Sequence, residues 1–150
     1  MEVDVVTLTT IRRPIEQVAR YAMDPTNAPV WYTRIRSVDW LTEPPVCVGS
    51  RVAFVARFLG RRLAYTYEIV EQSEAERLVM RTADGPFPME TTYAFETIAD
   101  GTTRVKLRNR GNPTGFSRLT TRLIVPAMRR ANRKDLERLR AIIEALPHDF

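Results

Sequence analysis

The end of the chain constrains the fold most, because residues Phe116 to Leu146 are predicted to form one long amphipathic helix. Its apolar residues recur every three or four positions, as on the buried face of a helix. These residues are Met128, Ala131, Leu136, Leu139, Ile142, Ile143 and Leu146. Two polar residues, Asn132 and Asp135, fall inside the same stripe, where a polar atom needs an internal partner or a cavity. The helix is therefore expected to close over a cavity that holds a small, largely apolar molecule.

Proline and basic residues define the other features of this helix. Pro126 is expected to kink or divide it, because proline lacks the backbone donor and clashes with the preceding turn. The side opposite the apolar stripe is basic, and its residues are Arg129, Arg130, Arg133, Lys134 and Arg140.

The chain before this helix begins with a strand and a small helical unit. Val3 to Arg12 is rich in Val, Thr and Ile and predicts a strand. Pro14 suits the first turn of a helix that runs to Met23, where Asp24-Pro25 stops it. A second short helical segment, Asn27 to Tyr32, contains Trp31.

Residues Ser37 to Arg110 alternate with period two and are broken only by turn residues, which predicts six successive antiparallel strands. Because every second residue of a strand points to the same face, the alternation assigns one set of side chains to the concave face of the sheet. This set is Val52, Phe54, Ala56, Phe58, Leu63, Tyr65, Tyr67, Ile69, Leu78, Met80, Phe87, Met89, Thr91, Tyr93, Phe95, Thr103, Val105, Leu107 and Asn109. The opposite face of the last strands is charged and is expected to form cross-strand ion pairs in solvent. Its residues are Glu90, Glu96, Arg104, Lys106, Arg108 and Arg110.

Composition narrows the class of protein. The chain has 150 residues, of which 44% are hydrophobic and 27% charged, so we expect one globular domain over residues 1–150. Cys47 is the only cysteine, which excludes an internal disulfide and thiolate-rich metal sites. The alternating residues that follow Met1 leave no room for an export signal, and no apolar run reaches about 18 residues. The expected location is the cytoplasm.

A net charge of +5 and a pI of 9.9 raise the question of an anionic partner. The basic residues are scattered from Arg12 to Arg140, whereas a nucleic-acid footprint should cluster on one face. We therefore do not expect a nucleic acid or ribosome as the main partner. Only the final helix offers a basic face, and contact with a membrane stays open without further support from the sequence.

The residues disfavour histidine, metal and phosphate chemistry. His148 is the only histidine and follows the helix-ending Pro147, so a triad or metal site that uses it is not expected. Carboxylates do not cluster on the inward parity, and the six glycines lie at turns rather than in a phosphate loop. Cys47 is expected to act as a small hydrophobic residue. No metal and no cofactor are predicted.

The candidate ligand-binding residues combine aromatic walls with a few polar groups, as in most small-molecule pockets. They are Trp31, Phe54, Phe58, Tyr65, Tyr67, Met80, Met89, Tyr93, Phe95, Asn109, Asn132 and Leu139, with Trp31 expected near the entrance. A domain of this size also needs such residues in its core, so each one has core packing as its alternative.

Asp135 is the candidate catalytic residue. Among apolar neighbours its pKa would rise, and it would act as a general acid or base on a carbonyl or enol. The alternative is a structural ion pair with an arginine, either Arg57 or Arg34.

The order of these elements resembles the START-like superfamily, also called SRPBCC, and within it the polyketide cyclase/dehydrase and lipid-transport branch. The residues that carry the resemblance are Arg13 to Val18, Met23 to Trp31, Val48 to Arg51 and Asp135 to Arg140. The resemblance implies an α+β helix-grip fold, in which a curved antiparallel sheet of about seven strands wraps around a long C-terminal helix, with two short helices after the first strand.

The same resemblance implies that the chain binds a hydrophobic molecule of polyketide, lipid or isoprenoid type. Cyclase or dehydratase chemistry is one alternative, and a carrier or sensor of lipids or quinones without chemistry is another. A third is an interaction module that uses the basic face of the last helix. Members of a superfamily that share a fold differ in function, so these alternatives stay open at this point. The sequence also leaves open whether the protein is a monomer or a homodimer.

Overall fold

The computed structural model describes residues 2–58, 60–112 and 118–150. Seven antiparallel strands form one sheet in the order β1-β7-β6-β5-β4-β3-β2. The strands are β1 (Val3–Ile11), β2 (Ile35–Trp40), β3 (Arg51–Phe58), β4 (Arg61–Ser73), β5 (Arg77–Asp84), β6 (Met89–Ala99) and β7 (Thr102–Gly111). The helices are α1 (Ile15–Met23), the 3₁₀ turn η1 (Pro25–Asn27), α2 (Ala28–Trp31) and α3 (Arg118–Ala145).

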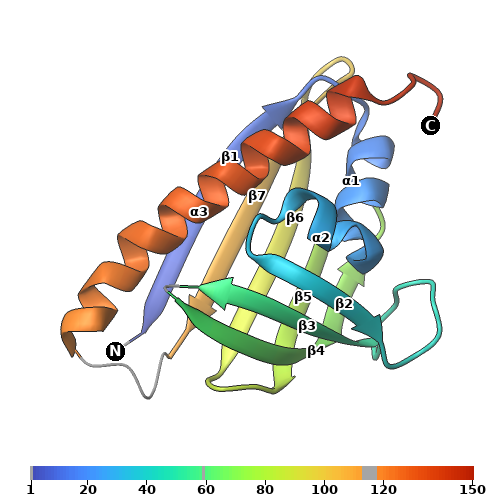
Figure 1. Cartoon of the computed structure of the whole chain (residues 1–150). Coiled ribbons are helices and arrows are strands. Elements are labelled where there is room, and N and C mark those ends of the chain that lie inside the picture. Colours follow the sequence, from blue (N-terminus) through green and yellow to red (C-terminus); the bar gives the residue numbers. More distant parts are fainter. Residues whose placement is uncertain (1, 59, 113–117) are drawn as a thin grey trace.

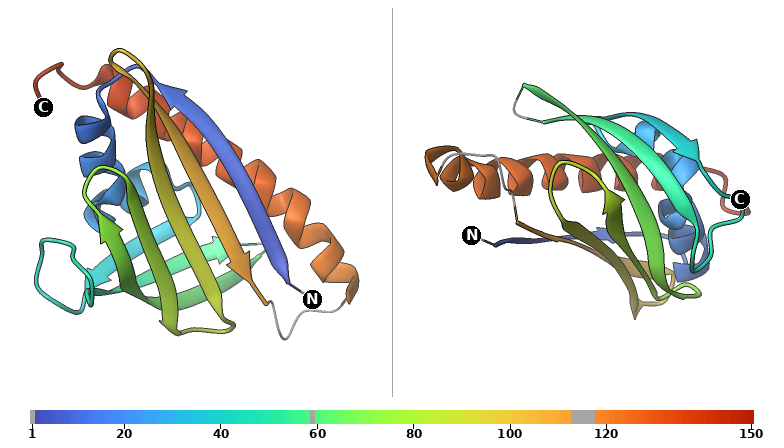
Figure 2. Two further views of the ribbon diagram at one scale, coloured as in Figure 1. Left: turned by 180° about the vertical axis from the view of Figure 1, so that it is seen from behind. Right: turned by 90° about the horizontal axis from the view of Figure 1, so that it is seen from below.

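The sheet curls strongly, and α3 lies along β1 across its concave side (Figure 1). The view from below shows how β2, β3 and β4 bend around the space beside the helix (Figure 2). A meander of hairpins suits this curl, because strand twist accumulates across the sheet and register irregularities bend it further, as at Ile35/Ser37 and Thr66/Tyr67. The predicted helix-grip fold, with seven strands and two short helices after the first strand, is confirmed.

The element boundaries differ from the predicted ones by a few residues. The first strand ends at Ile11 rather than Arg12, and the sheet resumes at Ile35 rather than Ser37. The predicted start of the last helix, Phe116, lies outside the described residues, and α3 ends at Ala145, one residue before the predicted end.

Pro126 was predicted to kink or divide the last helix. Helix α3 continues through Pro126 as one element, so this proline does not divide it, and the kink stays a prediction. Pro126 and Arg122, whose carbonyl loses its helical donor, are both exposed, and water can therefore satisfy that carbonyl. Within the described part of the chain, no helix combines the length and the apolar composition needed to cross a membrane.

The outer face of the sheet carries the predicted ion pairs. Those that cross neighbouring strands around β7, β6 and β1 join Arg81 to Glu90, Arg104 to Glu96, Arg108 to Asp4 and Arg110 to Glu2, at 2.7, 3.6, 2.6 and 3.1 Å. All are solvent-exposed, so each contributes at most about 1 kcal/mol to stability. The face is a solvated surface, as the alternation predicted.

Burial divides the space beneath α3 into two parts. The second half of the helix packs tightly, since Leu136, Leu139 and Ile143 are at most 1% exposed and join a core with Val18 and Trp31. The first half contributes Ile124 to a separate small cluster with Val3 and Val5 of β1. The solid core therefore lies toward the C-terminal end of α3.

We expect Leu139→Ala to lower the free energy of unfolding by about 2–5 kcal/mol, because the truncation leaves a cavity in this closed core. Chemical denaturation followed by circular dichroism measures the change. The matched control is Leu123→Ala on the same helix, where the side chain is 61% exposed and the effect should stay within about 0.5 kcal/mol. Equal effects at the two positions would contradict the assignment of Leu139 to the core.

Candidate functional site

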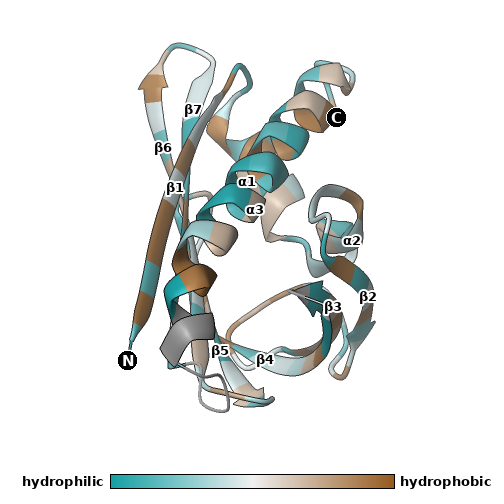
Figure 3. Cartoon of the chain, turned by 60° about the vertical axis from the view of Figure 1, so that its left-hand side comes forward, coloured by the Kyte–Doolittle hydropathy of each residue, from teal (hydrophilic) through white to brown (hydrophobic). Residues whose placement is uncertain are grey.

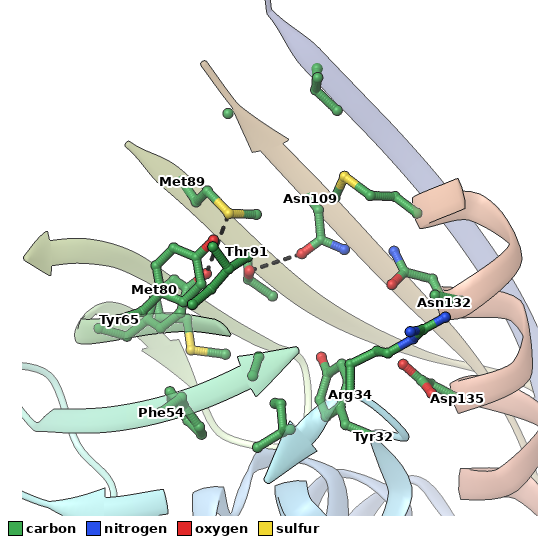
Figure 4. A pocket seen from close by; sticks show the side chains of 18 of the residues that line it. Tyr32, Arg34, Phe54, Tyr65, Met80, Met89, Thr91, Asn109, Asn132 and Asp135 are labelled. Carbon is green, nitrogen blue, oxygen red and sulfur yellow. Dashed lines mark hydrogen bonds between the residues drawn. The ribbon is translucent and has the colours of Figure 1, made fainter. Parts of the chain in front are cut away.

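A cavity of about 160 Å³ lies between the concave face of the sheet and the first half of α3 (Figure 4). All seven strands contribute to one wall, β1 through Val3 alone, and α3 contributes the other through residues from Ile124 to Asp135. The lining includes the exposed Arg34 and the half-buried Met128, so the cavity reaches the surface between β2 and α3.

Most of the predicted binding residues line this cavity together. They are Phe54, Tyr65, Tyr67, Met80, Met89, Tyr93, Asn109 and Asn132, and the predicted catalytic residue Asp135 lies beside them. Strand alternation explains the result, because every second residue of β3, β4, β5 and β6 faces the concave side. Their roles in ligand binding and catalysis remain predictions.

Three predicted residues are buried in the core and are not among the lining residues: Trp31, Phe95 and Leu139. Trp31 is 1% exposed rather than at an entrance, and its ring stacks on Tyr32 with centroids 3.9 Å apart. It also lies 6.0 Å from the ring of Tyr93, so it supports two side chains of the cavity wall. The side chain of Phe58 lies outside what the structure describes.

The sequence reasoning missed several lining residues near the start of β2, at the ends of β1 and β7, and on α3. They are Val3, Tyr32, Arg34, Ile35, Gly111 and Ile124. Tyr32 directly follows Trp31, which was the available signal. Alternation did not reveal Ile35, because it lies three residues from Val38 and the strand is irregular between Ile35 and Ser37. The turn between α2 and β2 has no marker in the sequence that gives its direction.

Asn132 presents an unsatisfied amide to the cavity. The residue is 7% exposed, and its Nδ2 has no hydrogen-bond partner among the described residues. Asn109, on β7, points toward the same space (Figure 4), and its Oδ1 accepts a 2.9 Å hydrogen bond from the hydroxyl of Thr91. Because that bond occupies the oxygen, Asn109 turns its amide nitrogen toward the cavity. Two amide donors therefore face an otherwise mostly apolar space.

Asp135 is held on one oxygen only. Its Oδ1 accepts hydrogen bonds from the backbone N–H and the hydroxyl of Thr33, both at 2.9 Å. Its Oδ2 makes no hydrogen bond to the described residues. No arginine of the described part lies within ion-pair distance, so Thr33 takes the place of the alternative partners Arg57 and Arg34.

The pKa of Asp135 reflects this position. Desolvation by burial raises it above the ordinary value of 3.8, against the opposing effects of the Thr33 hydrogen bonds and of the charges on Arg34 and Arg138. Arg34, directly before β2, extends toward Asn132 and Asp135 at the open side of the cavity (Figure 4). The carboxyl group is therefore suited to exchange a proton closer to neutral pH than an exposed aspartate does.

A pair of tyrosines completes the polar part of the cavity. The hydroxyl oxygens of Tyr32 and Tyr93 are 2.5 Å apart. Burial raises the pKa of both, and raises the pKa of the neighbouring Tyr67 to about 12, so all three hydroxyls stay protonated at neutral pH. One hydroxyl of the pair donates to the other, and Tyr67 donates to the Sδ of Met89, so the pair keeps one hydrogen that can bond to a ligand oxygen. Within the described residues no group of three or more His, Cys, Asp or Glu could hold a metal ion.

This fold and cavity define a helix-grip protein with a largely apolar internal cavity. A family model described as polyketide cyclase / dehydrase and lipid transport matches residues 2–144, and the chain belongs to this family. It is a START-like, or SRPBCC, protein, and family and fold together support binding of a hydrophobic small molecule. No curated protein matches the sequence significantly.

Solved structures show the same fold. A Thermus thermophilus protein superposes with a TM-score of 0.81 at 22% identity, covering 95% of this chain and 97% of that one. The Zhui aromatase/cyclase from a Streptomyces species gives 0.82 at 14% identity, with 96% and 94% covered. A START superfamily protein from Mycobacterium smegmatis gives 0.71 at 13% identity, with 94% of both chains covered. At these identities the similarity establishes the fold alone.

The raised pKa of Asp135 predicts a pH dependence of stability. At pH values between 3.8 and the raised pKa, Asp135 is protonated more often in the folded chain than in the unfolded one. The stability that this protonation adds is fully present below pH 3.8 and is lost as pH rises through the raised pKa. Asp135→Asn keeps an acceptor for Thr33 but does not titrate. We expect the variant to gain stability relative to wild type as pH rises from about 4 through the raised pKa of Asp135, measured by denaturant unfolding.

Asp4→Asn is the control of opposite sign. The hydrogen bond from Arg108 lowers the pKa of Asp4. The stability that ionised Asp4 adds to the fold is therefore present above pH 3.8 and is lost as pH falls through the lowered pKa. This variant should therefore lose stability relative to wild type as pH rises toward about 4. A pH-independent difference between Asp135→Asn and wild type would show that Asp135 is not desolvated.

Proposed function

We propose that the protein binds a hydrophobic, ring-bearing molecule that carries carbonyl oxygens, as polyketide-derived compounds do. The family description and the aromatase/cyclase among the similar structures support this substrate class. The rings would lie against the aromatic and methionine wall of the sheet, and the oxygens would lie at α3. Apolar area then supplies binding energy, and the polar groups fix the orientation.

One observation carries the proposal, namely that the buried amide nitrogen of Asn132 has no hydrogen-bond partner in the part of the chain that the structure describes. A buried donor that makes no hydrogen bond lowers stability by about 1–3 kcal/mol, so its presence in an apolar cavity is explained best by a ligand acceptor. The amide nitrogen of Asn109, and the one hydroxyl hydrogen of Tyr32 and Tyr93 that is not used between them, offer further donors to the same ligand. A carbonyl or enolate oxygen is the acceptor that such a set of donors recognises.

The size of the cavity agrees with such a ligand. In another protein an apolar cavity of about 150 Å³ binds benzene, and the cavity here has about 160 Å³ and reaches the surface beside Arg34. One or two fused rings would fit inside, and a longer molecule would extend toward the opening.

The first test compares acetylnaphthalene with ethylnaphthalene, which have nearly the same shape and differ in the carbonyl oxygen. Wild type should bind the ketone more tightly, and Asn132→Leu should weaken ketone binding about tenfold while leaving the hydrocarbon unchanged. The same variant should raise the free energy of unfolding of the empty protein by about 1 kcal/mol, because it removes an unsatisfied donor. Calorimetric titration and denaturant unfolding measure the two effects.

Asn109→Leu is the matched control. It removes the acceptor of the Thr91 hydroxyl, so the empty protein should lose stability instead of gaining it. Equal affinity of wild type for the two naphthalenes, or a loss of stability in Asn132→Leu, would contradict the proposed role of Asn132.

Cyclase or dehydratase chemistry is the second candidate function, and the free Oδ2 of Asp135 is the observation that favours it. Both reactions begin with removal of a proton next to a carbonyl group. The Oδ2 atom would take this proton, and the electron pair of the broken C–H bond would move onto the carbonyl oxygen. The donors Asn132 and the tyrosine pair would stabilise the resulting enolate.

We expect wild type to speed the exchange of the acetyl protons of acetylnaphthalene for deuterium by about a hundredfold over buffer, measured by proton NMR in D₂O. Asp135→Asn should abolish this acceleration and keep the affinity for the ketone, because the amide accepts from Thr33 but does not take up a proton. Binding without exchange in wild type would leave the non-catalytic carrier or sensor as the function, and a hydrophobic compound retained through purification would support it.

A further inference from the structure

Ion pairing differs between the two faces of the molecule. The cross-strand ion pairs cover the outer face of the sheet, whereas the described side chains of α3 make one, between Arg140 and Glu144 at 3.5 Å. Several exposed cations on α3 have no carboxylate within ion-pair distance among the described residues. They are Arg122, Arg129, Arg130, Arg133 and Lys134. The net charge of +5 is therefore concentrated along this helix.

Part of this charge borders the cavity opening. Leu123, Ala127, Arg130 and Lys134 follow one another at spacings of four, three and four residues, which places them on one stripe of α3. We call these four residues the rim stripe. It lies beside the stripe of Ile124, Ala131 and Asp135, which line the cavity.

Two contacts fix the direction in which the rim stripe faces. One turn beyond Lys134, the Nε of Arg138 donates a 2.8 Å hydrogen bond to the carbonyl of Val30 on α2. Asp135 contacts Thr33, between α2 and β2. This side of α3 therefore faces α2 and β2, across the opening where Arg34 lies. The outward side of α3 is hydrophilic along most of its length (Figure 3).

Apolar side chains are exposed beside these charges. Leu123 is 61% exposed on the rim stripe, and Val30 is 46% exposed on α2 next to the Arg138 contact. A basic surface with exposed aliphatic side chains is complementary to the headgroup region of an anionic bilayer, where cations meet lipid phosphates and short apolar groups enter the interface.

We propose that the rim stripe docks the cavity opening onto an anionic lipid bilayer, so that the hydrophobic ligand passes between membrane and cavity without crossing water. The proposal rests on the proposed function, since it assumes a ligand too apolar to reach the cavity efficiently through water. Exposing apolar surface to water costs about 25 cal/mol per Å². A fused-ring ligand that passes directly from the bilayer into the cavity avoids this cost.

A bilayer fits these residues better than a nucleic acid does. Proteins that bind single strands combine cations with exposed aromatic side chains for stacking, and the rim stripe contains none. The cations also border the opening of an apolar cavity, which gives a lipid surface a role in ligand exchange that a nucleic acid would not have.

The experiment is co-sedimentation of the whole protein with vesicles of phosphatidylcholine, with and without phosphatidylglycerol. Wild type should bind the anionic vesicles and not the neutral ones. The double variant R130Q/K134Q should weaken binding about 30-fold, because each cation near an anionic surface contributes about 1 kcal/mol. Neither residue lines the cavity.

The matched control is R104Q/K106Q on the outer face of β7, which removes the same charge from the other side of the molecule. Its binding should fall less than about threefold. Equal losses in both double variants would overturn the proposal, since attraction would then come from net charge alone. Tighter binding of wild type to a single-stranded oligonucleotide than to anionic vesicles, lost in R130Q/K134Q, would overturn it in favour of a nucleic-acid surface.

Calorimetric titration of acetylnaphthalene into R130Q/K134Q separates this proposal from the proposed function. Unchanged ketone affinity with lost vesicle binding supports docking by the rim stripe. Vesicle binding by wild type without any ketone binding would overturn the proposed function alone, and ketone binding without vesicle binding would overturn the docking alone.

Discussion

The structure depends on one packing constraint, which is that α3 closes the curved sheet firmly along only half of its length. Leu136, Leu139 and Ile143 fill the space against α1 and Trp31, because α1 and α2 supply a second layer there. The first half of α3 has no such layer beneath it, and the curl of β3 to β6 carries the sheet away from the helix. Side chains on that half reach across a gap that they do not fill, and the cavity is the result.

The polar groups of the site follow from this geometry. Asn132 and Asp135 are one helical turn apart at the boundary between the filled and the hollow part. Thr33 satisfies one oxygen of Asp135, but the Nδ2 of Asn132 makes no hydrogen bond to the described residues. An apolar residue there would make a more stable empty protein. A residue that lowers stability without improving the core is the usual mark of a binding site.

The periodicity of strands and helices explains which residues of the site could be predicted from the sequence. Alternation identified Phe54, Tyr67 and Tyr93 as concave residues, and helical spacing identified Asn132 and Asp135, because both periods are properties of the local backbone. Parity does not give depth, so it did not separate Phe95, in the core, from Tyr93, at the cavity. Tyr32, Arg34 and Thr33 reach the site through the turn between α2 and β2, and tertiary packing sets the direction of that turn.

The difference between a carrier and an enzyme on this fold comes down to the second oxygen of one carboxyl group. A carrier needs the Asn132 donor and the apolar wall, and both would serve equally well with Asp135 fully hydrogen-bonded. Thr33 instead occupies Oδ1 twice and leaves Oδ2 free, beside a cavity whose desolvation already raises the pKa of the group. A carboxylate with a purely structural role stabilises the fold more with each hydrogen bond that its oxygens accept. The Oδ2 of Asp135 accepts none from the described residues, which fits a carboxyl group that takes a proton or a hydrogen bond from the ligand.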